Sequence, residues 1–393
     1  MKRADALSIA MVTETYPPEV NGVARTMYLI VEGLRSRGHD IRLVRPRQSA
    51  ADRALDEPGY REMLKPGFRI PRYPQLRMGF PARGALLAEW REETPDVVHI
   101  ATEGPLGASA LAAARALGIP VATDFHTNFD AYSGHYGIGM LERLVMLHLR
   151  RLHNRAGCTL VPTDEMAEAL ARDGFERLRV VGRGVDSAVF SPAKRSAELR
   201  ASWGAHEDTP VALCVSRFAP EKNFPLVLEA YRAMRAARPD TKLVLVGDGP
   251  LAESLRSEGL GVVLAGRKVN GELSRHYASA DIFLYPSLTE TFGLVTLEAM
   301  ASGLAIVAYD YAAARQYLVH GRSALLPARE DRAAFLQHAV GLATDLRRAR
   351  TLGHYARGIA EGLGWDRVVL DFEAALRRMI DEAAAIQERH AAA

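Results

Sequence analysis

Short apolar runs of strand length alternate with segments of helical composition along almost the whole chain, and this alternation constrains the fold more than any other feature. Strands are predicted in the first half at 7–12, 41–44, 97–100, 121–124 and 158–162, and in the second half at 211–216, 243–246, 262–265, 282–285 and 305–308. Helices are predicted between them at 23–37, 104–117, 140–154, 225–238, 251–258, 270–279 and 294–302. Such alternation is typical of parallel sheets with helices on both faces. We therefore expect an α/β protein.

The length of 393 residues exceeds what one ordinary core supports, so two domains are expected. Residues 1–183 and 209–365 each have the strand–helix order of a doubly wound, Rossmann-like domain, and the turn-rich stretch 184–208 is predicted to link them. No strand follows the amphipathic segment at about 366–388, which we predict to be a helix that packs back on the first domain. Residues 48–84 are rich in Pro and Arg with weak periodicity, and we assign them no structure.

The composition, with 48% hydrophobic and 25% charged residues, is typical of a soluble globular protein. The net charge of +3 does not indicate strong binding to nucleic acid. No apolar run reaches the roughly 18–20 residues that cross a bilayer, and the first residues lack the apolar core of a signal peptide. Cys158 and Cys214 lie in apolar strand-like runs, which predicts two buried, reduced thiols and a cytoplasmic protein.

Two carboxylates stand on either side of a Phe-Gly pair in the segment 290–298. Glu290 follows the predicted strand 282–285, and Glu298 lies a turn or two into the predicted helix that begins at Leu294. In open α/β sheets, ligands bind beyond the carboxyl ends of the strands. The N–H groups at a helix start bind phosphate, and a carboxylate accepts hydrogen bonds from sugar hydroxyls. The segment therefore predicts a sugar-nucleotide site.

Two cationic side chains, Arg217 and Lys222, lie in the loop between the strand 211–216 and the helix 225–238. Arg can hold a diphosphate as a fork and Lys as a point charge, so this loop is a candidate diphosphate site. Solvated loop charge is the alternative, but the place of the loop at the ligand edge of the sheet favours binding. No group of His, Cys or carboxylate side chains has metal-ligand spacing, so no metal site is predicted.

The first half of the chain contains two further candidates. Gly22 stands where the first strand leads into a helix, and its lack of a side chain permits close approach of an anionic group. A plain turn glycine fits the pattern at least as well. His126 follows the strand 121–124 among polar residues, where a functional role is favoured over a structural one. The G-x-G-x-x-G pattern of dinucleotide binding does not occur at this junction.

The predicted helix 140–154 has an apolar stripe flanked by basic residues, among them Arg143, Arg150 and Arg151. A helix of this type can lie on an anionic membrane surface. It can equally be a surface helix whose apolar stripe packs on the sheet. The sequence leaves both interpretations open.

Taken in order, these elements resemble a retaining GT-B glycosyltransferase of family 4, and the resemblance covers nearly the whole chain. Its motifs are the Gly22 loop, Arg217 with Lys222, Glu290-x-Phe-Gly-x-x-x-x-Glu298 and the pattern Gly-Val-Asp-x-x-x-Phe-x-Pro at 184–192. The segments 125–129 and 308–314 resemble the branch that glycosylates membrane lipids, notably GDP-mannose-dependent α-mannosyltransferases acting on diacylglycerol glycolipids. The GT-B fold implies two Rossmann-like domains that face a deep cleft.

The resemblance implies a role for each candidate residue. Arg217 and Lys222 would hold the donor diphosphate and stabilise it as it leaves, while Glu290 and His126 would contact the transferred hexose. Glu298 would accept hydrogen bonds from the ribose. The other donor-binding residues implied are Gly22, Lys268, Phe292, Gly293, Leu294 and Val295, with Lys268 near the base.

The family also implies a reaction, in which a hexose passes from a nucleotide sugar to a lipid or glycolipid acceptor with retention of configuration. Mannose from GDP-mannose is the first expectation, at the inner membrane face. No cofactor is expected beyond the nucleotide sugar, because Arg217 and Lys222 supply the charge that a divalent metal would bring. UDP-glucose or UDP-galactose with a soluble or polysaccharide acceptor is the first alternative. Sugar-nucleotide epimerisation by a GT-B enzyme is the second.

Overall fold

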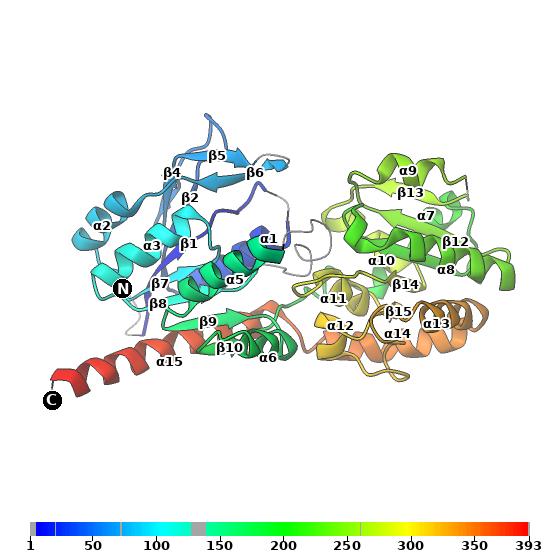
Figure 1. The fold of residues 1–393 in the computed structure, drawn as a ribbon. Helices are drawn as coiled ribbons and strands as arrows, with labels where there is room; N and C mark the ends of the chain where they lie inside the picture. The colour runs from blue at the N-terminus through cyan, green and yellow to red at the C-terminus, as the bar shows by residue number, and fades with distance from the viewer. Residues whose placement is uncertain (1–4, 20, 71–72, 127–138, 260, 392–393) are drawn as a thin grey trace. The chain divides into compact units, whose positions relative to one another are not determined.

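The computed structural model describes residues 5–19, 21–70, 73–126, 139–259 and 261–391 (Figure 1). The chain divides into two compact units, of which the first contains Met1–Arg183 with Trp365–Ala393 and the second contains Gly184–Gly364. Each unit is built on a mainly parallel sheet. Of the segment 125–129, which contributes to the family resemblance, residues 127–129 lie outside the described part of the chain.

The first unit contains an eight-stranded sheet in the order β10-β9-β8-β7-β1-β2-β4-β3. Neighbouring strands run parallel except β3, which pairs antiparallel with β4 at the edge. Strands β7, β8 and β9 are buried along their whole lengths, as is typical of parallel strands covered on both faces. The strand bounds are β1 Ser8–Val12, β2 Asp40–Pro46, β3 Asp56–Glu57, β4 Tyr60–Lys65, β7 Val97–Ile100, β8 Val121–Asp124, β9 Cys158–Val161 and β10 Leu178–Val180.

Helices cover both faces of this sheet, with α1 (Gly22–Ser36) and α15 (Trp365–Ala391) on one face and α2 (Arg83–Glu92) and α3 (Pro105–Ala116) on the other. Two further helices, α5 (Gly139–His153) and α6 (Asp164–Arg172), help bury Phe125 and Val161 near β8 and β9. A Cβ atom on Gly33 of α1 would lie 2.4 Å from Cγ2 of Val369. Helix α15 therefore packs closely on α1, which confirms that the C-terminal helix returns to the first unit (Figure 1).

The Pro- and Arg-rich excursion contains four strands that the sequence pattern did not reveal. Strands β3 and β4 extend the main sheet, whereas β5 (Gly67–Ile70) and β6 (Tyr73–Gly79) form a separate antiparallel hairpin. The buried Arg45 side chain lies 2.8 Å from carboxylate oxygens of both Asp52 and Glu62. Charged contacts of this kind help hold the region to the sheet, and an analysis of apolar periodicity does not detect them.

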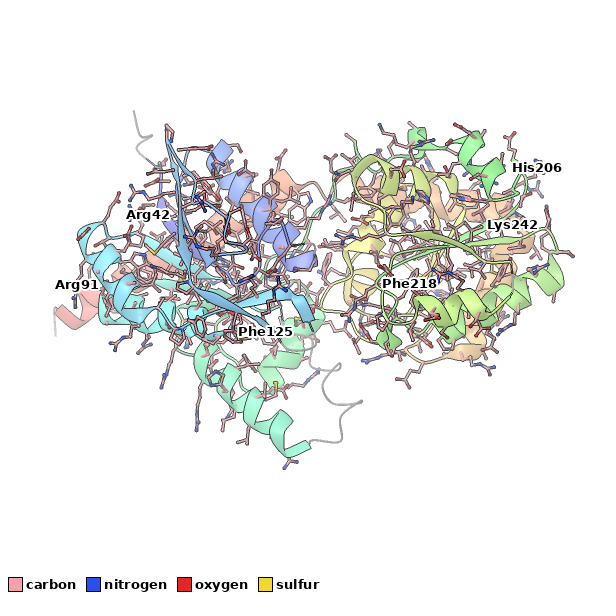
Figure 2. The ribbon with its side chains drawn as sticks, turned by 90° about the horizontal axis from the view of Figure 1, so that it is seen from above. Arg42, Arg91, Phe125, His206, Phe218 and Lys242 are labelled. Atoms are coloured by element: carbon pink, nitrogen blue, oxygen red, sulfur yellow. The ribbon has the colours of Figure 1, made fainter. Side chains whose placement is uncertain are left out.

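The second unit contains a five-stranded parallel sheet in the order β13-β12-β11-β14-β15. The first strand of the unit is central and the chain winds outward from it in both directions, so the ligand edge lies at the carboxyl ends of the strands. Figure 2 shows Phe218, which follows β11, and Lys242, which begins β12, toward opposite ends of this unit. The strand bounds are β11 Val211–Val215, β12 Lys242–Val246, β13 Val263–Gly266, β14 Ile282–Tyr285 and β15 Ala305–Ala308.

Residues 184–208, predicted as a linker, lie within the second unit. Val185, Phe190 and Trp203 are buried in its core, and the stretch includes a 3-10 turn, η1 (Pro192–Lys194), and a short helix, α7 (Ala197–Ser202). The turn formers indicate the bends correctly, but the widely spaced apolar residues between them pack on the sheet. The other helices of this unit are α8 Phe224–Ala237, α9 Ala252–Ser257, α10 Asn270–Ser279, α11 Leu294–Ala301, α12 Ala312–Tyr317, α13 Arg332–Thr344 and α14 Leu346–Ala360.

Both cysteines are buried and free, which confirms the predicted thiols. Within the described residues, none of the helices combines the length and apolar character needed to span a membrane. The same residues contain no cluster of three or more His, Cys, Asp or Glu side chains that could hold a metal ion.

Candidate functional site

The ends of β11 and β14 bring together two residues that are far apart in the sequence. Lys222 lies in a 3-10 turn, η2 (Pro220–Lys222), between β11 and α8, and Glu290 lies in the loop after β14. The Nζ atom of Lys222 is 2.5 Å from Oε1 of Glu290. The side chains are 15% and 14% exposed, so this ion pair is mostly shielded yet reachable from solvent.

Two hydroxyl groups converge on the same carboxylate oxygen. The phenol of Tyr285 and the Oγ of Ser287 both donate to Oε1 of Glu290, the latter at 2.8 Å. Burial, and then the charge of Glu290, hold the pKa of Tyr285 well above its ordinary value, so the phenol stays protonated. The backbone carbonyl of Ser287 in turn accepts a hydrogen bond from the Tyr311 hydroxyl at 2.9 Å.

The sequence analysis missed these three supporting residues. Tyr285 was assigned only to a buried strand, and Ser287 only to the loop that follows it. Their positions in the sequence could have indicated two of them, because Tyr285 and Ser287 stand five and three positions before Glu290 at the ligand edge of the sheet. Tyr311 falls in the segment 308–314 that contributes to the family resemblance.

The start of α11 supplies backbone donors beside this ion pair. Gly293 precedes the helix with φ +90°, a left-handed conformation that favours glycine. The first N–H groups of a helix, here those of Leu294 and Val295, have no acceptor within the helix and suit an anion. Phe292 is 6% exposed, and Glu298 lies one turn into the helix, 9% exposed. The structure therefore places the second carboxylate on the same helix as these donors.

Arg217 is exposed immediately beyond β11, in a loop that packs tightly on a glycine turn. A Cβ atom on Gly247 would lie 1.8 Å from the Ser216 carbonyl, and one on Gly249 would lie 2.5 Å from the Phe218 carbonyl. The N–H of Phe218 donates to the Asp248 carbonyl at 2.8 Å. This Gly-Asp-Gly turn therefore supports the loop of Arg217 and Lys222 by close backbone packing.

Lys268 lies apart from Lys222 and Glu290 in the sheet order. It follows β13, which is three strand spacings from β14, or about 14 Å across the sheet. Its Nζ is 3.5 Å from Oε2 of Glu272. Together they line a hollow of about 240 Å³ with the buried rings of Trp203 and His276.

In the first unit, His126 is part of a buried charged cluster at the end of β8. Its Nε2 lies 3.2 Å from Oδ2 of Asp124, and Arg183 approaches the two oxygens of that carboxylate at 3.1 and 3.4 Å. Burial opposes ionisation of Asp124, but His126 and Arg183 hold its pKa well below the ordinary value. Burial also lowers the pKa of the neighbouring His99 to about 4, so that ring is neutral.

A second buried carboxylate, which the sequence analysis did not single out, follows β1. Glu14 accepts hydrogen bonds from the N–H of Leu106 at 2.9 Å and of Gly79 at 3.4 Å, and so caps helix α3. Burial raises its pKa to about 7, although these N–H groups act in the opposite direction. Gly22 is exposed at the start of α1, where the side chain of Asn21 caps the helix by accepting from the Ala24 N–H at 2.8 Å.

Helix α5 presents a mixed surface. Arg143 and Arg151 are exposed, whereas Arg150 donates to the Asp173 carbonyl at 3.1 Å. Leu144 and Val145 are 57% and 42% exposed, and the buried side of the helix packs through other leucines. The apolar stripe therefore packs on the unit in part and faces solvent in part.

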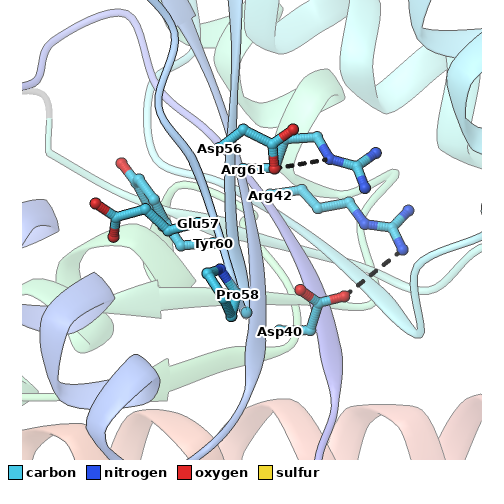
Figure 3. A pocket seen from close by; sticks show the side chains of 8 residues that line it. Asp40, Arg42, Asp56, Glu57, Pro58, Tyr60 and Arg61 are labelled. Carbon is cyan, nitrogen blue, oxygen red and sulfur yellow. Dashed lines mark ion pairs between the residues drawn. The ribbon is translucent and has the colours of Figure 1, made fainter.

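A hollow of about 360 Å³ lies in the first unit at the start of β2 and β4 (Figure 3). This edge of the sheet is opposite the edge where Gly22 and His126 follow the strands. Arg42 and Arg61 line the hollow, but both are paired with carboxylates: Arg42 lies 2.7 Å from Glu93, and Arg61 lies 3.2 Å from Glu93 and 3.8 Å from Asp56. Its cations are thus already neutralised, and the hollow offers no diphosphate site.

Comparison with known proteins agrees with this geometry. Residues 20–189 match the family model described as Glycosyltransferase Family 4, and residues 209–345 match Glycosyl transferases group 1. A GDP-mannose-dependent alpha-mannosyltransferase of Mycolicibacterium smegmatis is 35% identical over 324 residues, which cover 81% of this chain and 84% of that protein. The chain belongs to glycosyltransferase family 4. It is therefore a glycosyltransferase, as the motifs predicted.

Other members of the family and the solved structures fit the same assignment. Alpha-monoglucosyldiacylglycerol synthase of Acholeplasma laidlawii is 29% identical over 77% of this chain and 81% of its own length. Sucrose-phosphate synthase from Thermosynechococcus elongatus superposes with a TM-score of 0.76 at 20% identity, covering 95% of this glycosyltransferase and 99% of that chain. HepE from Anabaena, in complex with UDP and glucose, superposes with a TM-score of 0.72 at 18% identity and covers 94% of this chain and 99% of its own. The fold of the family 4 enzyme is GT-B.

Proposed function

We propose that this enzyme is a retaining mannosyltransferase that moves mannose from GDP-mannose to a lipid or glycolipid acceptor and forms an α-glycosidic bond. The observation that carries the proposal is the contact of Lys222 with Glu290 beside the start of α11. It sets a cation, a carboxylate and helix N–H groups at one ligand edge. The GDP-mannose-dependent relatives support the choice of donor, and the diacylglycerol-glycolipid synthase supports the choice of a lipid acceptor.

Each group has a part in donor binding under this proposal. Lys222 and Arg217 bind the diphosphate, and the N–H groups of Leu294 and Val295 in α11 assist them. Glu298 accepts from the ribose hydroxyls, and Glu290 accepts from the hexose. His126 and Gly22 of the first unit approach the hexose and the diphosphate. Lys268 lies near the base.

The chemistry follows from charge that develops during transfer. As the bond between the sugar and the phosphate breaks, negative charge grows on the diphosphate and the sugar becomes oxocarbenium-like. Fixed cations and N–H dipoles stabilise that state, and removal of one such group typically costs about 10²–10³ in rate. The acceptor oxygen forms the new bond on the same face of the sugar, and its proton passes to the leaving phosphate. Glu290 acts as a hydrogen-bond acceptor and not as a nucleophile.

Cations of this chain serve the leaving group, so a bound metal has no assigned role in the proposal. Transfer by enzyme treated with a chelator should equal transfer by untreated enzyme. Restoration of lost activity by Mg²⁺ or Mn²⁺ after chelation would contradict this part of the proposal.

The acceptor side of the proposal places the enzyme peripherally on the inner membrane face. The exposed Leu144 and Val145 of α5 stand beside the exposed Arg143 and Arg151, a combination that suits an anionic lipid surface. An R143Q/R151Q variant should bind anionic vesicles more weakly, by about 1 kcal/mol per charge. R91Q removes an exposed arginine of α2 and is the matched control. Equal binding by all three proteins would count against this surface.

The decisive test of donor and acceptor is a panel assay. The enzyme is incubated with radiolabelled GDP-mannose, UDP-glucose or UDP-galactose and total membrane lipids, and the lipids are then extracted. Label in the lipid phase from GDP-mannose is expected. Label only from a UDP-sugar, only in a water-soluble product, or in an altered sugar nucleotide would replace the proposal by one of the alternatives. A K222A/E290A variant that keeps full activity would refute the site assignment.

A further inference from the structure

The carboxylate of Glu290 is held asymmetrically. Three donors, the Tyr285 phenol, Ser287 Oγ and Lys222 Nζ, all contact Oε1. Among the residues that the structure describes, none donates a hydrogen bond to Oε2. One oxygen is therefore taken up by the protein and the other remains for a ligand.

This arrangement fixes the orientation of the carboxylate. The three donors come from three different positions of the chain, so the oxygen that they contact is held from several sides. A partial rotation of the carboxylate would move the oxygen away from the buried phenol of Tyr285 and leave that phenol without its acceptor, which is costly. Tyr285 is buried, and burial raises its pKa well above the ordinary value, so the phenol remains a donor at neutral pH.

We propose that Tyr285 is a positioning residue: with Ser287 it holds Oε1 of Glu290, so that Oε2 alone accepts a single hydroxyl group of the transferred hexose. The inference rests on the proposed role of Glu290 in hexose binding and adds how that residue is aimed. The two hydroxyl donors are needed to hold Glu290 because Lys222 also binds the diphosphate. As the diphosphate binds and leaves, Lys222 is drawn toward it, while the two hydroxyl groups keep Glu290 in place.

The test uses the Tyr285→Phe variant of the full chain, which removes one oxygen and creates no large cavity. The donor is compared with analogues that each lack one hexose hydroxyl group. The wild-type enzyme is expected to lose about 10–100-fold in kcat/KM with one of these analogues, because a hydrogen bond to a charged acceptor is lost. Tyr285→Phe should lower kcat/KM for the intact donor about 10-fold or more, and should reduce the penalty for that same analogue to under about 3-fold.

The matched control is Tyr231→Phe. Tyr231 is also a buried tyrosine of the second unit, but its hydroxyl lies 3.5 Å from the Thr241 carbonyl, away from the ligand edge. This control should keep the wild-type pattern across all analogues. A structural effect of Tyr285→Phe would instead lower activity for every analogue equally, and that result would overturn the proposal. If Tyr285→Phe does not fold, Ser287→Ala is subjected to the same comparison and the same criterion.

The outcome also separates this inference from the proposed function. If Glu290→Ala keeps full transfer activity, the site assignment itself fails. If Glu290→Ala loses activity while Tyr285→Phe and Ser287→Ala discriminate among the analogues as the wild type does, only the positioning role is refuted.

Discussion

Replacement of Arg183 by Met should strongly destabilise the first unit, because it leaves the carboxylate of Asp124 buried without its cation. The two side chains are only 3% and 1% exposed and lie 3.1 Å apart. Removal of one partner from a buried ion pair costs about 3–5 kcal/mol, a large part of a typical stability of about 5–15 kcal/mol. His126, whose Nε2 lies 3.2 Å from Oδ2 of Asp124, remains beside the carboxylate as a hydrogen-bond partner and offsets part of that cost. We therefore expect a loss of about 3 kcal/mol at pH 7.

The assay is urea unfolding followed by circular dichroism. R367M is the matched control, since Arg367 and Asp371 form an exposed pair on α15 with side chains 73% and 45% exposed, and it should change stability by less than about 0.5 kcal/mol. D124N/R183M removes both charges and should be more stable than R183M. A loss below about 0.5 kcal/mol in R183M, or no recovery in the double variant, would refute the reasoning.

The pH dependence of this cluster has a definite sign. The folded pKa of Asp124 lies below its unfolded value of about 3.9. Its stabilising contribution is therefore fully present above that unfolded value and is lost as the pH falls through the folded pKa. The gap in stability between wild type and D124N/R183M should narrow in strong acid, and a constant gap would show that Asp124 is not held ionised.

Two further predictions concern Glu14 and Gly293. The folded pKa of Glu14, about 7, lies above the unfolded value of 4.5, so the contribution of Glu14 to stability is full below pH 4.5 and is lost as the pH rises through 7. The difference in Tm between wild type and E14Q (wild type minus E14Q) should therefore fall between pH 5 and 8. A difference that rises over this range would contradict the raised pKa. G293A should lower stability by about 1–2 kcal/mol and weaken donor binding, because a Cβ atom there meets nothing closer than 3.6 Å and the cost comes from the left-handed backbone alone. Unchanged urea midpoint and donor KM in G293A would show that this backbone conformation is unimportant.

Several features could be predicted from local sequence because they depend on neighbouring residues. The buried parallel strands have continuous apolar runs, and the segment 290–298 places its carboxylates on a strand–loop–helix junction. Lys222 and Glu290 were each predicted from the place of their loops at strand ends. Their direct contact was not, since it depends on β11 and β14 being neighbours in the sheet.

The features that sequence analysis missed depend on distant contacts. Arg183 stands one residue before the predicted linker, and nothing in its own neighbourhood indicates that it pairs with Asp124, 59 positions away. Likewise, Glu14 looks like an ordinary loop carboxylate until the fold brings Leu106, 92 positions away, within 2.9 Å of it. Burial acts to raise the pKa of both carboxylates. The cations beside Asp124 outweigh it and lower the pKa of that group, whereas Glu14 has only backbone N–H groups as donors and its pKa remains raised.

The sequence by itself determined the α/β class, the existence of two sheets, the family and the residue types at the ligand edge. These follow from periodicity and from motifs that each occupy one strand–loop–helix junction. The tertiary structure alone decided which oxygen of Glu290 is occupied, which carboxylate keeps its charge, and that residues 184–208 belong to the second core. Such properties depend on distances between atoms that the chain brings together only on folding, and electrostatic and hydrogen-bond energies change steeply over those few ångströms.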